Sequence, residues 1–411
     1  MRRLSNPTPD PRPEDTLEHA PQPVPATQIS ASRAWGRTGV VSTVAHLRAA
    51  WPDLRDTSLI GLDLRHEAFD WATAYLDRTL FLGCRLPVGA GERLTNAGAG
   101  VLRAPDGLPF DPFRTDLYSY EELTFGTRPH LNDRITAWFA ASTMNVHDEV
   151  VRALHDATTT AAVARFVMHR RVVGIMGGHA VPRDDELYRR VAELGRTFTR
   201  AGYTIATGGG PGVMEAANLG AWLAPEPDGA LGAALAILAA APVEGTDPEA
   251  YIGAALEVRN RWPGGGRLGG ESLGVPTFLY INEATTGFAT HIAKFFAYSI
   301  REDGLLTIAR SGVVYAPGRA GTEQELFSDS AQNSLTLYKV RSPMVLFGSE
   351  YFERDRPELF AALRHQSTTF GWDRLLTVCD DPQEALLFVQ AHDPDAAGTA
   401  GIERRRSHPD V

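Results

Sequence analysis

From residue 172 to about residue 391, short apolar runs alternate with amphipathic segments. The runs are rich in β-branched and aromatic residues, which predicts strands, and the segments between them place apolar residues at helical spacing. Strands are expected at 172–176, 203–207, 232–238, 276–281, 313–315, 343–347 and 375–379, and helices at 184–200, 288–301, 357–365 and 382–391 and directly after the glycine-rich stretches 208–212 and 318–321. This alternation predicts an α/β fold with a doubly wound, mostly parallel sheet.

Residues 1–170 follow a different pattern. Seven of the 27 prolines lie in residues 1–30, which we expect to be a disordered tail, as we do residues 393–411. Residues 31–170 mix short apolar runs with turns and predict an additional mixed N-terminal accessory domain, which ends in two helices over 132–166. Its runs LIGLDLR and LFLGCRL share an alternating apolar pattern that stacked β-coils would explain, although two copies do not establish a repeat. The second domain is expected at 171–392.

Glycine-rich turns follow several of these strands. The run VVY stops at Pro317 and Gly318, and Gly321 stands directly before Thr322 and a helix-forming segment. A strand, a tight turn and a helix start together present unpaired N–H groups at the positive end of a helix dipole, where an anion such as phosphate binds. The stretch GGGPG, with Gly208, Gly209, Gly210 and Gly212, is a second such turn. We expect both turns at the carboxyl ends of their strands, where doubly wound sheets bind ligands.

Glu325 allows two interpretations. It follows Thr322 by three residues, which is the spacing of a capping box that stabilises a helix start without any chemical role. A carboxylate one helical turn from a phosphate site would also stand about a ribose length from the anion, where it could act on C1′ of a nucleotide.

Cationic side chains lie upstream of this turn. Arg301 is expected near a helix end, where a cation is favoured by the helix dipole alone. His291 and Lys294 are more typical of surface or interface groups than of catalytic ones. The segment 257–274 is basic and rich in glycine, and it is either a lid over an anionic ligand or a disordered insertion.

Composition narrows the functional classes. The formal net charge of −10 opposes broad binding to nucleic acid or to an anionic membrane. With two cysteines, no secretory segment and no apolar run of about 20 residues, the sequence predicts a cytoplasmic protein. It contains no zinc-type cluster, no dinucleotide-binding pattern and no Walker pattern, so we expect neither a metal nor a cofactor.

The two glycine stretches carry a family resemblance. GGGPGVMEAANLGA, followed about a hundred residues later by PGRAGTEQE, resembles the lonely guy (LOG) family of nucleoside 5′-monophosphate phosphoribohydrolases, in its larger two-domain bacterial type. The resemblance implies a Rossmann-like fold, a homo-oligomer and hydrolysis of a nucleotide to free base and ribose 5-phosphate.

The same resemblance implies roles for single residues. Gly318, Gly321 and Thr322 would hold the phosphate, Gly209 and Gly210 would line the cleft, and Glu325 would be the catalytic carboxylate, with Arg301 as the nearest match to the family's arginine. Two residues depart from the pattern: Arg319 replaces a glycine, and Glu302 stands where many members have lysine. A nucleotide sensor without catalysis is therefore the alternative function.

Overall fold

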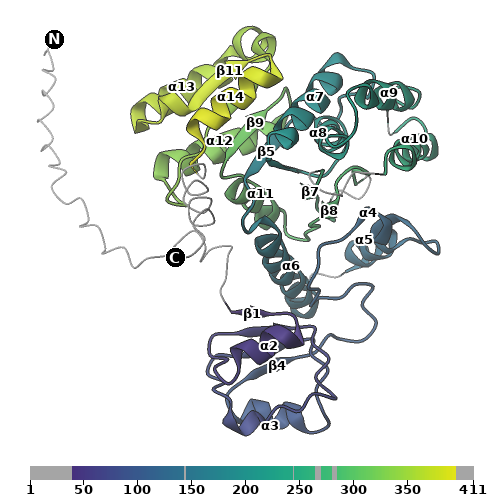
Figure 1. The fold of residues 1–411 in the computed structure, drawn as a ribbon, viewed down its shortest axis with the longest axis vertical. Coiled ribbons are helices and arrows are strands. Elements are labelled where there is room, and N and C mark those ends of the chain that lie inside the picture. Colours follow the sequence, from purple (N-terminus) through teal and green to yellow (C-terminus); the bar gives the residue numbers. More distant parts are fainter. Residues whose placement is uncertain (1–38, 143–144, 244, 264–269, 280–284, 395–411) are drawn as a thin grey trace, which may run out of the picture.

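The computed structural model describes residues 39–142, 145–243, 245–263, 270–279 and 285–394, so the predicted tail at residues 1–30 lies outside the described residues. Its larger part is a seven-stranded parallel sheet in the order β11-β10-β9-β5-β6-β7-β8 (Figure 1). The strands are β5 (Val172–Met176), β6 (Thr204–Thr207), β7 (Ser272–Gly274), β8 (His291–Ile292), β9 (Gly312–Tyr315), β10 (Met344–Phe347) and β11 (Leu376–Cys379). The predicted doubly wound α/β fold is confirmed. The chain order reverses between β5 and β9, which marks the switch point at which such sheets bind ligands.

Helices cover both faces of this sheet. One face carries α7 (Glu186–Arg200), α8 (Val213–Trp222) and α14 (Pro382–His392), with α9 (Gly229–Leu238) and α10 (Pro248–Arg261) beside them. The other face carries α6 (Val146–Val167), α11 (Tyr298–Ile308), α12 (Ala320–Leu335) and α13 (Pro357–Phe370). Because both faces are covered, successive strand residues such as Val172 and Val173 are all buried.

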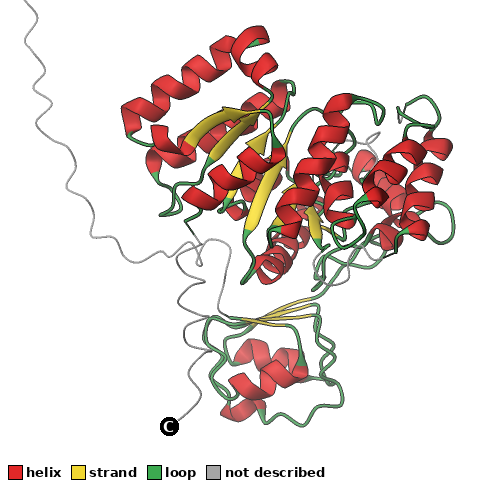
Figure 2. Ribbon diagram, turned by 45° about the horizontal axis from the view of Figure 1, so that its top comes forward, coloured by secondary structure: helices red, strands yellow, loops and turns green. Residues whose placement is uncertain are grey.

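The N-terminal part is a separate four-stranded parallel sheet. Its strands are β1 (Val40–Val41), β2 (Ser58–Ile60), β3 (Leu80–Leu82) and β4 (Gly100–Leu102), with α2 (Val44–Ala50) and α3 (Ala90–Asn96) packed against them (Figure 2). Leu59 pairs in register with Phe81, and both are buried in the same core cluster. The alternating pattern shared by the two apolar runs therefore reflects stacked strands. The exact domain limits at 31–170 and 171–392 stay predictions.

Three predicted elements are wrong. Residues 232–238 belong to helix α9, because alanine and leucine are strong helix formers and a short apolar run does not reveal its period. The strand expected at 276–281 lies earlier, as β7, and residues 280–281 fall outside the described part. The helix expected at 288–301 is instead the edge strand β8 followed by α11, which begins only at Tyr298.

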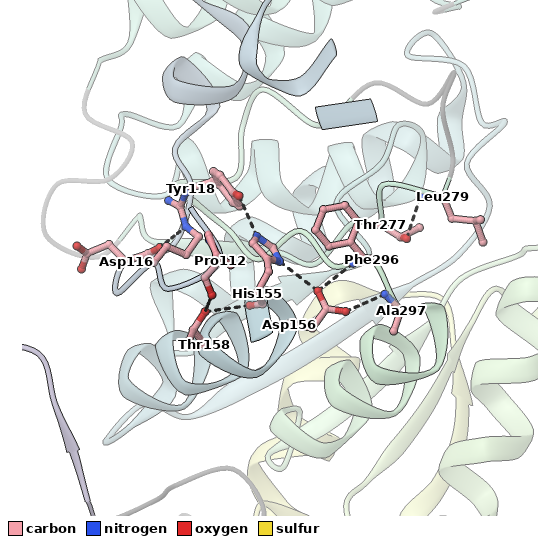
Figure 3. Close-up of polar contacts among 11 residues, drawn as sticks. Pro112, Asp116, Tyr118, His155, Asp156, Thr158, Thr277, Leu279, Phe296 and Ala297 are labelled. Carbon is pink, nitrogen blue, oxygen red and sulfur yellow. Dashed lines mark hydrogen bonds and ion pairs between the residues drawn. The ribbon is translucent and has the colours of Figure 1, made fainter. Parts of the chain in front are cut away.

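The start of α11 is fixed by a buried polar chain (Figure 3). His155 on α6 lies with Nε2 2.9 Å from the Tyr118 hydroxyl and Nδ1 3.1 Å from Asp156 Oδ1. The Asp156 carboxylate accepts hydrogen bonds from the backbone N–H groups of Phe296, at 3.0 Å, and Ala297, at 2.8 Å. Since Ala297 directly precedes α11, a residue of α6 determines where that helix begins.

The helices expected at 132–166 are confirmed as α5 (Leu131–Ala141) and α6. The short helix α4 (Tyr120–Thr124) precedes them. In the described part of the chain, no helix is both long and apolar enough to cross a membrane.

Candidate functional site

A cavity of about 600 Å³ opens at the carboxyl ends of β5, β6 and β9, beside the switch point of the sheet. This volume is within the range of small-molecule sites. The cavity is lined by Met176, Gly177, Gly178, His179, Gly208, Pro211, Met214, Pro276, Thr277, Tyr298, Arg301, Glu302, Arg319, Ala320, Gly321, Thr322 and Glu325. Both glycine stretches therefore reach one cavity, as the sequence predicts.

The start of α12 forms part of the cavity wall. Arg319 is the N-cap residue and adopts an extended backbone, with φ of −116°, which any residue can take. The arginine that replaces a glycine at this position is thus compatible with the turn. A Cβ on Gly318 would lie 2.2 Å from Thr322 Oγ1, so glycine is required there for the close approach of Thr322. Gly321 has open space around it.

The capping-box interpretation of Glu325 is wrong. Helix α12 begins at Ala320, so Thr322 and Glu325 both lie inside the helix and share one face. The Glu325 side chain does not return to the helix start; it lines the cavity instead.

Arg301 and two glutamates form a buried cluster in the cavity wall. Arg301 Nη1 contacts Glu302 Oε1 and lies 3.2 Å from Glu325 Oε1, while Nε donates to the Val275 carbonyl at 2.8 Å. All three charged side chains are less than a tenth exposed. Arg301 lies near the N-terminus of α11 and not near its C-terminus, where a cation is favoured, so the expected dipole role does not apply.

Burial raises the pKa of Glu325 to about 8, against the lowering effect of Arg301 and with a further raising effect of Glu302. One arginine beside two carboxylates leaves an excess negative charge in a place with little water, and a bound proton relieves it. A carboxyl group with a pKa near neutrality can both donate and accept a proton, which is the requirement for general acid–base chemistry.

The GGGPG turn shapes the cavity mainly through the close packing of its glycines. A Cβ on Gly208 would lie 2.1 Å from Arg301 Nη2, so this glycine makes room for the arginine. Gly209 has φ of +77° and packs on the Pro276 ring, and Gly212, the N-cap of α8, has φ of +67° and packs on the Gly178 carbonyl. Gly210 is buried. Of the four predicted glycines, Gly208 lines the cavity directly.

Two polar residues of α8, Glu215 and Asn218, anchor the GGGPG turn through hydrogen bonds. Glu215 accepts two hydrogen bonds from Arg183, at 2.6 and 2.9 Å, and one each from the hydroxyls of Tyr188 and Tyr251. The Thr207 hydroxyl donates a hydrogen bond to the Asn218 side-chain oxygen and accepts one from the Gly209 N–H at 3.1 Å. These bonds anchor α8 and the turn to the sheet.

The other basic residues that the sequence brought into question, His291, Lys294 and Arg259, do not line the cavity. His291 is on the edge strand β8, with its ring 4.4 Å from that of Phe166. Lys294 is buried against Asn132, at 2.8 Å from its Oδ1. In the segment 257–274, Arg259 belongs to α10, bonds the Gly287 carbonyl and Glu121, and lies over the Trp222 ring. Residues 264–269 of the proposed lid, Arg267 included, fall outside the described part.

Several lining residues were not predicted as part of a site, among them Met176, Thr277, Tyr298 and Glu302. The glycine pair that ends β5 was a usable signal, because Gly178 donates to the Pro317 carbonyl and accepts from Val213, and so links both motifs. Thr277 and Tyr298 lie within the mispredicted elements 276–281 and 288–301 and gave no local signal. Within the described residues, no group of three or more His, Cys, Asp or Glu side chains is arranged to hold a metal ion.

Comparisons with known proteins bear on the fold. A search of curated proteins found no match. Similar solved structures are the molybdenum cofactor binding protein from the phototrophic bacterium Rippkaea orientalis, at 16% identity and a TM-score of 0.33, and the molybdenum cofactor carrier protein from Chlamydomonas reinhardtii, at 18% and 0.32. Each comparison covers 55% of this chain and 98% of the other. Residues 170–229, which contain β5, α7, β6, the GGGPG turn and α8, match the model of the SLOG cluster4 family, so this segment is similar to that family.

Proposed function

We propose that the cavity binds a nucleoside 5′-monophosphate and hydrolyses its N-glycosidic bond to free base and ribose 5-phosphate. The observation that carries the proposal is that one cavity wall combines two kinds of groups. Arg319 and the N-terminus of α12 can hold an anion, and Glu302 and Glu325 present two carboxyl groups around Arg301. A ligand that carries a phosphate and develops positive charge elsewhere during the reaction would find a suitable partner for each.

The phosphate would bind at residues 318–322, through N–H groups of the first turn of α12 and the Arg319 guanidinium. This remote contact would supply the binding energy that positions C1′. Gly318 permits the tight turn that directs these groups to the cavity, and Gly321 leaves its rim open.

Beside the two carboxyl groups, departure of the base leaves positive charge on the ribose ring, as in the hydrolysis of glycosides. Glu325 would stabilise that charge or activate the attacking water. Arg301 would hold Glu325 in place through the contact at 3.2 Å. The resemblance to the LOG family, whose members perform this reaction, supports the same residues.

The alternative is a SLOG-type nucleotide sensor that binds without turnover. It is favoured by two observations. The SLOG cluster4 match covers residues 170–229 and so contains the first motif but not the second, which carries Glu325. Arg301 is also already engaged by two carboxylates and a carbonyl.

Incubation of the purified protein with a panel of nucleoside 5′-monophosphates, followed by chromatography of the bases, separates the two functions. Release of free base supports the hydrolase. Binding by calorimetry without any release supports the sensor. The homo-oligomeric state and the cytoplasmic location stay predictions, and light scattering on the same sample measures the first.

A further inference from the structure

Glu302 introduces a second carboxylate into the cavity. It is adjacent to Arg301 on α11, about 6% exposed, and part of the cavity wall together with Glu325. Its Oε1 contacts Arg301 Nη1, the same nitrogen that serves Glu325. A single guanidinium nitrogen therefore bridges two carboxyl groups from two helices.

The other oxygen of Glu302 is unusual in this setting. Oε2 is buried and has no hydrogen-bond partner among the described residues. A buried carboxylate oxygen without a partner is costly, and native proteins keep such atoms where a ligand, a proton or water completes them. Glu302 is part of the cavity wall, so its carboxyl group borders the space that a ligand would occupy.

We infer that Glu302 is a second catalytic carboxylate, which shares one proton with Glu325 across Arg301. This inference rests on the proposed hydrolysis of a nucleoside 5′-monophosphate. Two close carboxyl groups in a site with little water do not both ionise readily, so the pair holds one acid and one base. The raised pKa of Glu325, to which Glu302 contributes, agrees with this arrangement.

The reaction balances with these two groups alone. The electron pair of the C1′–N bond leaves with the base, and the protonated carboxyl of the pair gives its proton to the base nitrogen. Water adds to C1′ and passes a proton to the ionised carboxyl, which restores the single proton of the pair. The products are free base and ribose 5-phosphate.

The test compares E302Q with D303N, which removes the neighbouring, exposed carboxylate of the same helix. We measure kcat/KM for base release from about pH 5 to about pH 10, and expect a bell-shaped profile for the wild-type protein and D303N. In E302Q we expect a fall of about 10²-fold or more and loss of the bell shape. Calorimetric binding of the nucleotide confirms that each variant is folded.

A second variant, E302D, keeps the carboxyl group and is expected to retain more activity than E302Q. Equal activity of E302D and E302Q, or an E302Q profile that matches D303N at every pH while the wild-type protein releases base, overturns this inference and leaves the proposed function intact. If the wild-type protein releases no base from any nucleotide tested, the proposed function and the inference both fall.

Discussion

Arg301 Nη1 lies 3.2 Å from Glu325 Oε1, and each side chain is only about 8% exposed. The contact joins α11 to α12 across the cavity, between residues 24 positions apart. Arg301 reaches this position because Asp156 fixes the start of α11 and because Gly208 has no Cβ. The ion pair thus depends on three separate segments of the chain.

Arg301→Ala is expected to destabilise the fold at alkaline pH. Removal of one partner of a buried ion pair costs about 3–5 kcal/mol, because the remaining charge is left without compensation. The cost should shrink at acidic pH, where Glu325 is protonated. Urea unfolding at an alkaline and at an acidic pH measures this loss of stability. The matched control R354A removes an exposed arginine paired with Glu350 and should change the stability by less than about 1 kcal/mol. A destabilisation by Arg301→Ala that does not vary with pH would contradict the buried ion pair between Arg301 and Glu325.

Gly208→Ala is expected to reduce base release while the protein stays folded. The added Cβ would lie 2.1 Å from Arg301 Nη2 and 2.6 Å from Met214 Sδ, and both neighbours are ends of flexible side chains that can move. Displacement of the guanidinium should lower kcat/KM by about tenfold or more, since misplacement of a positioning group by about 1 Å can cost 10²-fold. The control G232A adds a Cβ in open space on α9 and should leave activity unchanged. Wild-type activity in G208A would contradict the role of Arg301.

Arg319→Ala is expected to raise KM for a nucleoside 5′-monophosphate with little change in kcat. Arg319 is exposed at the cavity rim, so it contributes an electrostatic contact to the phosphate that is equal in ground and transition states. The effect should diminish as salt is added, because salt screens exposed charges. Steady-state kinetics at low and high ionic strength measure it. A fall in kcat with unchanged KM would place Arg319 in the chemical step instead.

Asp329→Asn is expected to flatten the pH dependence of stability. Burial raises the pKa of Asp329 from 3.8 to about 7, although its hydrogen bond with the Tyr315 hydroxyl opposes the rise. A carboxyl whose pKa is raised in the folded state stabilises the fold below its unfolded pKa, and this contribution is lost as pH rises from about 4 to about 7. Urea midpoints across this window should fall in the wild-type protein and fall less in D329N. Equal slopes would count against the buried, protonated carboxyl.

Much of the sheet was predictable because its strands carry strong local signals. β5 and β9 combine β-branched residues with glycines at their ends, and both were placed correctly. β7 and β8 have three and two residues, too few for a periodic signal, and α9 is an alanine and leucine run that a strand pattern imitates. The start of α11 depends on Asp156, a tertiary contact with no local signature.

The site was predictable to the extent that it follows the glycine stretches. Gly208, Gly321, Thr322, Arg301, Arg319 and Glu325 all line one cavity. The helical register of Glu325 was not predictable, because the capping spacing and the interior of a helix look alike in the sequence. Glu302 and Arg301 are neighbours on α11, but the contact between their side chains became evident only in the structure.

Glu325→Gln is the most direct measurement of the central claim. The substitution keeps the size and polarity of the side chain but removes its ability to hold a charge or exchange a proton. With the nucleotide that the wild-type protein cleaves, we expect calorimetric affinity within about threefold of wild type and a fall in base release of about 10²–10⁴-fold. E323Q, at a half-buried position of the same helix that pairs with Arg356, is the matched control. Base release by E325Q at the wild-type rate would contradict the account.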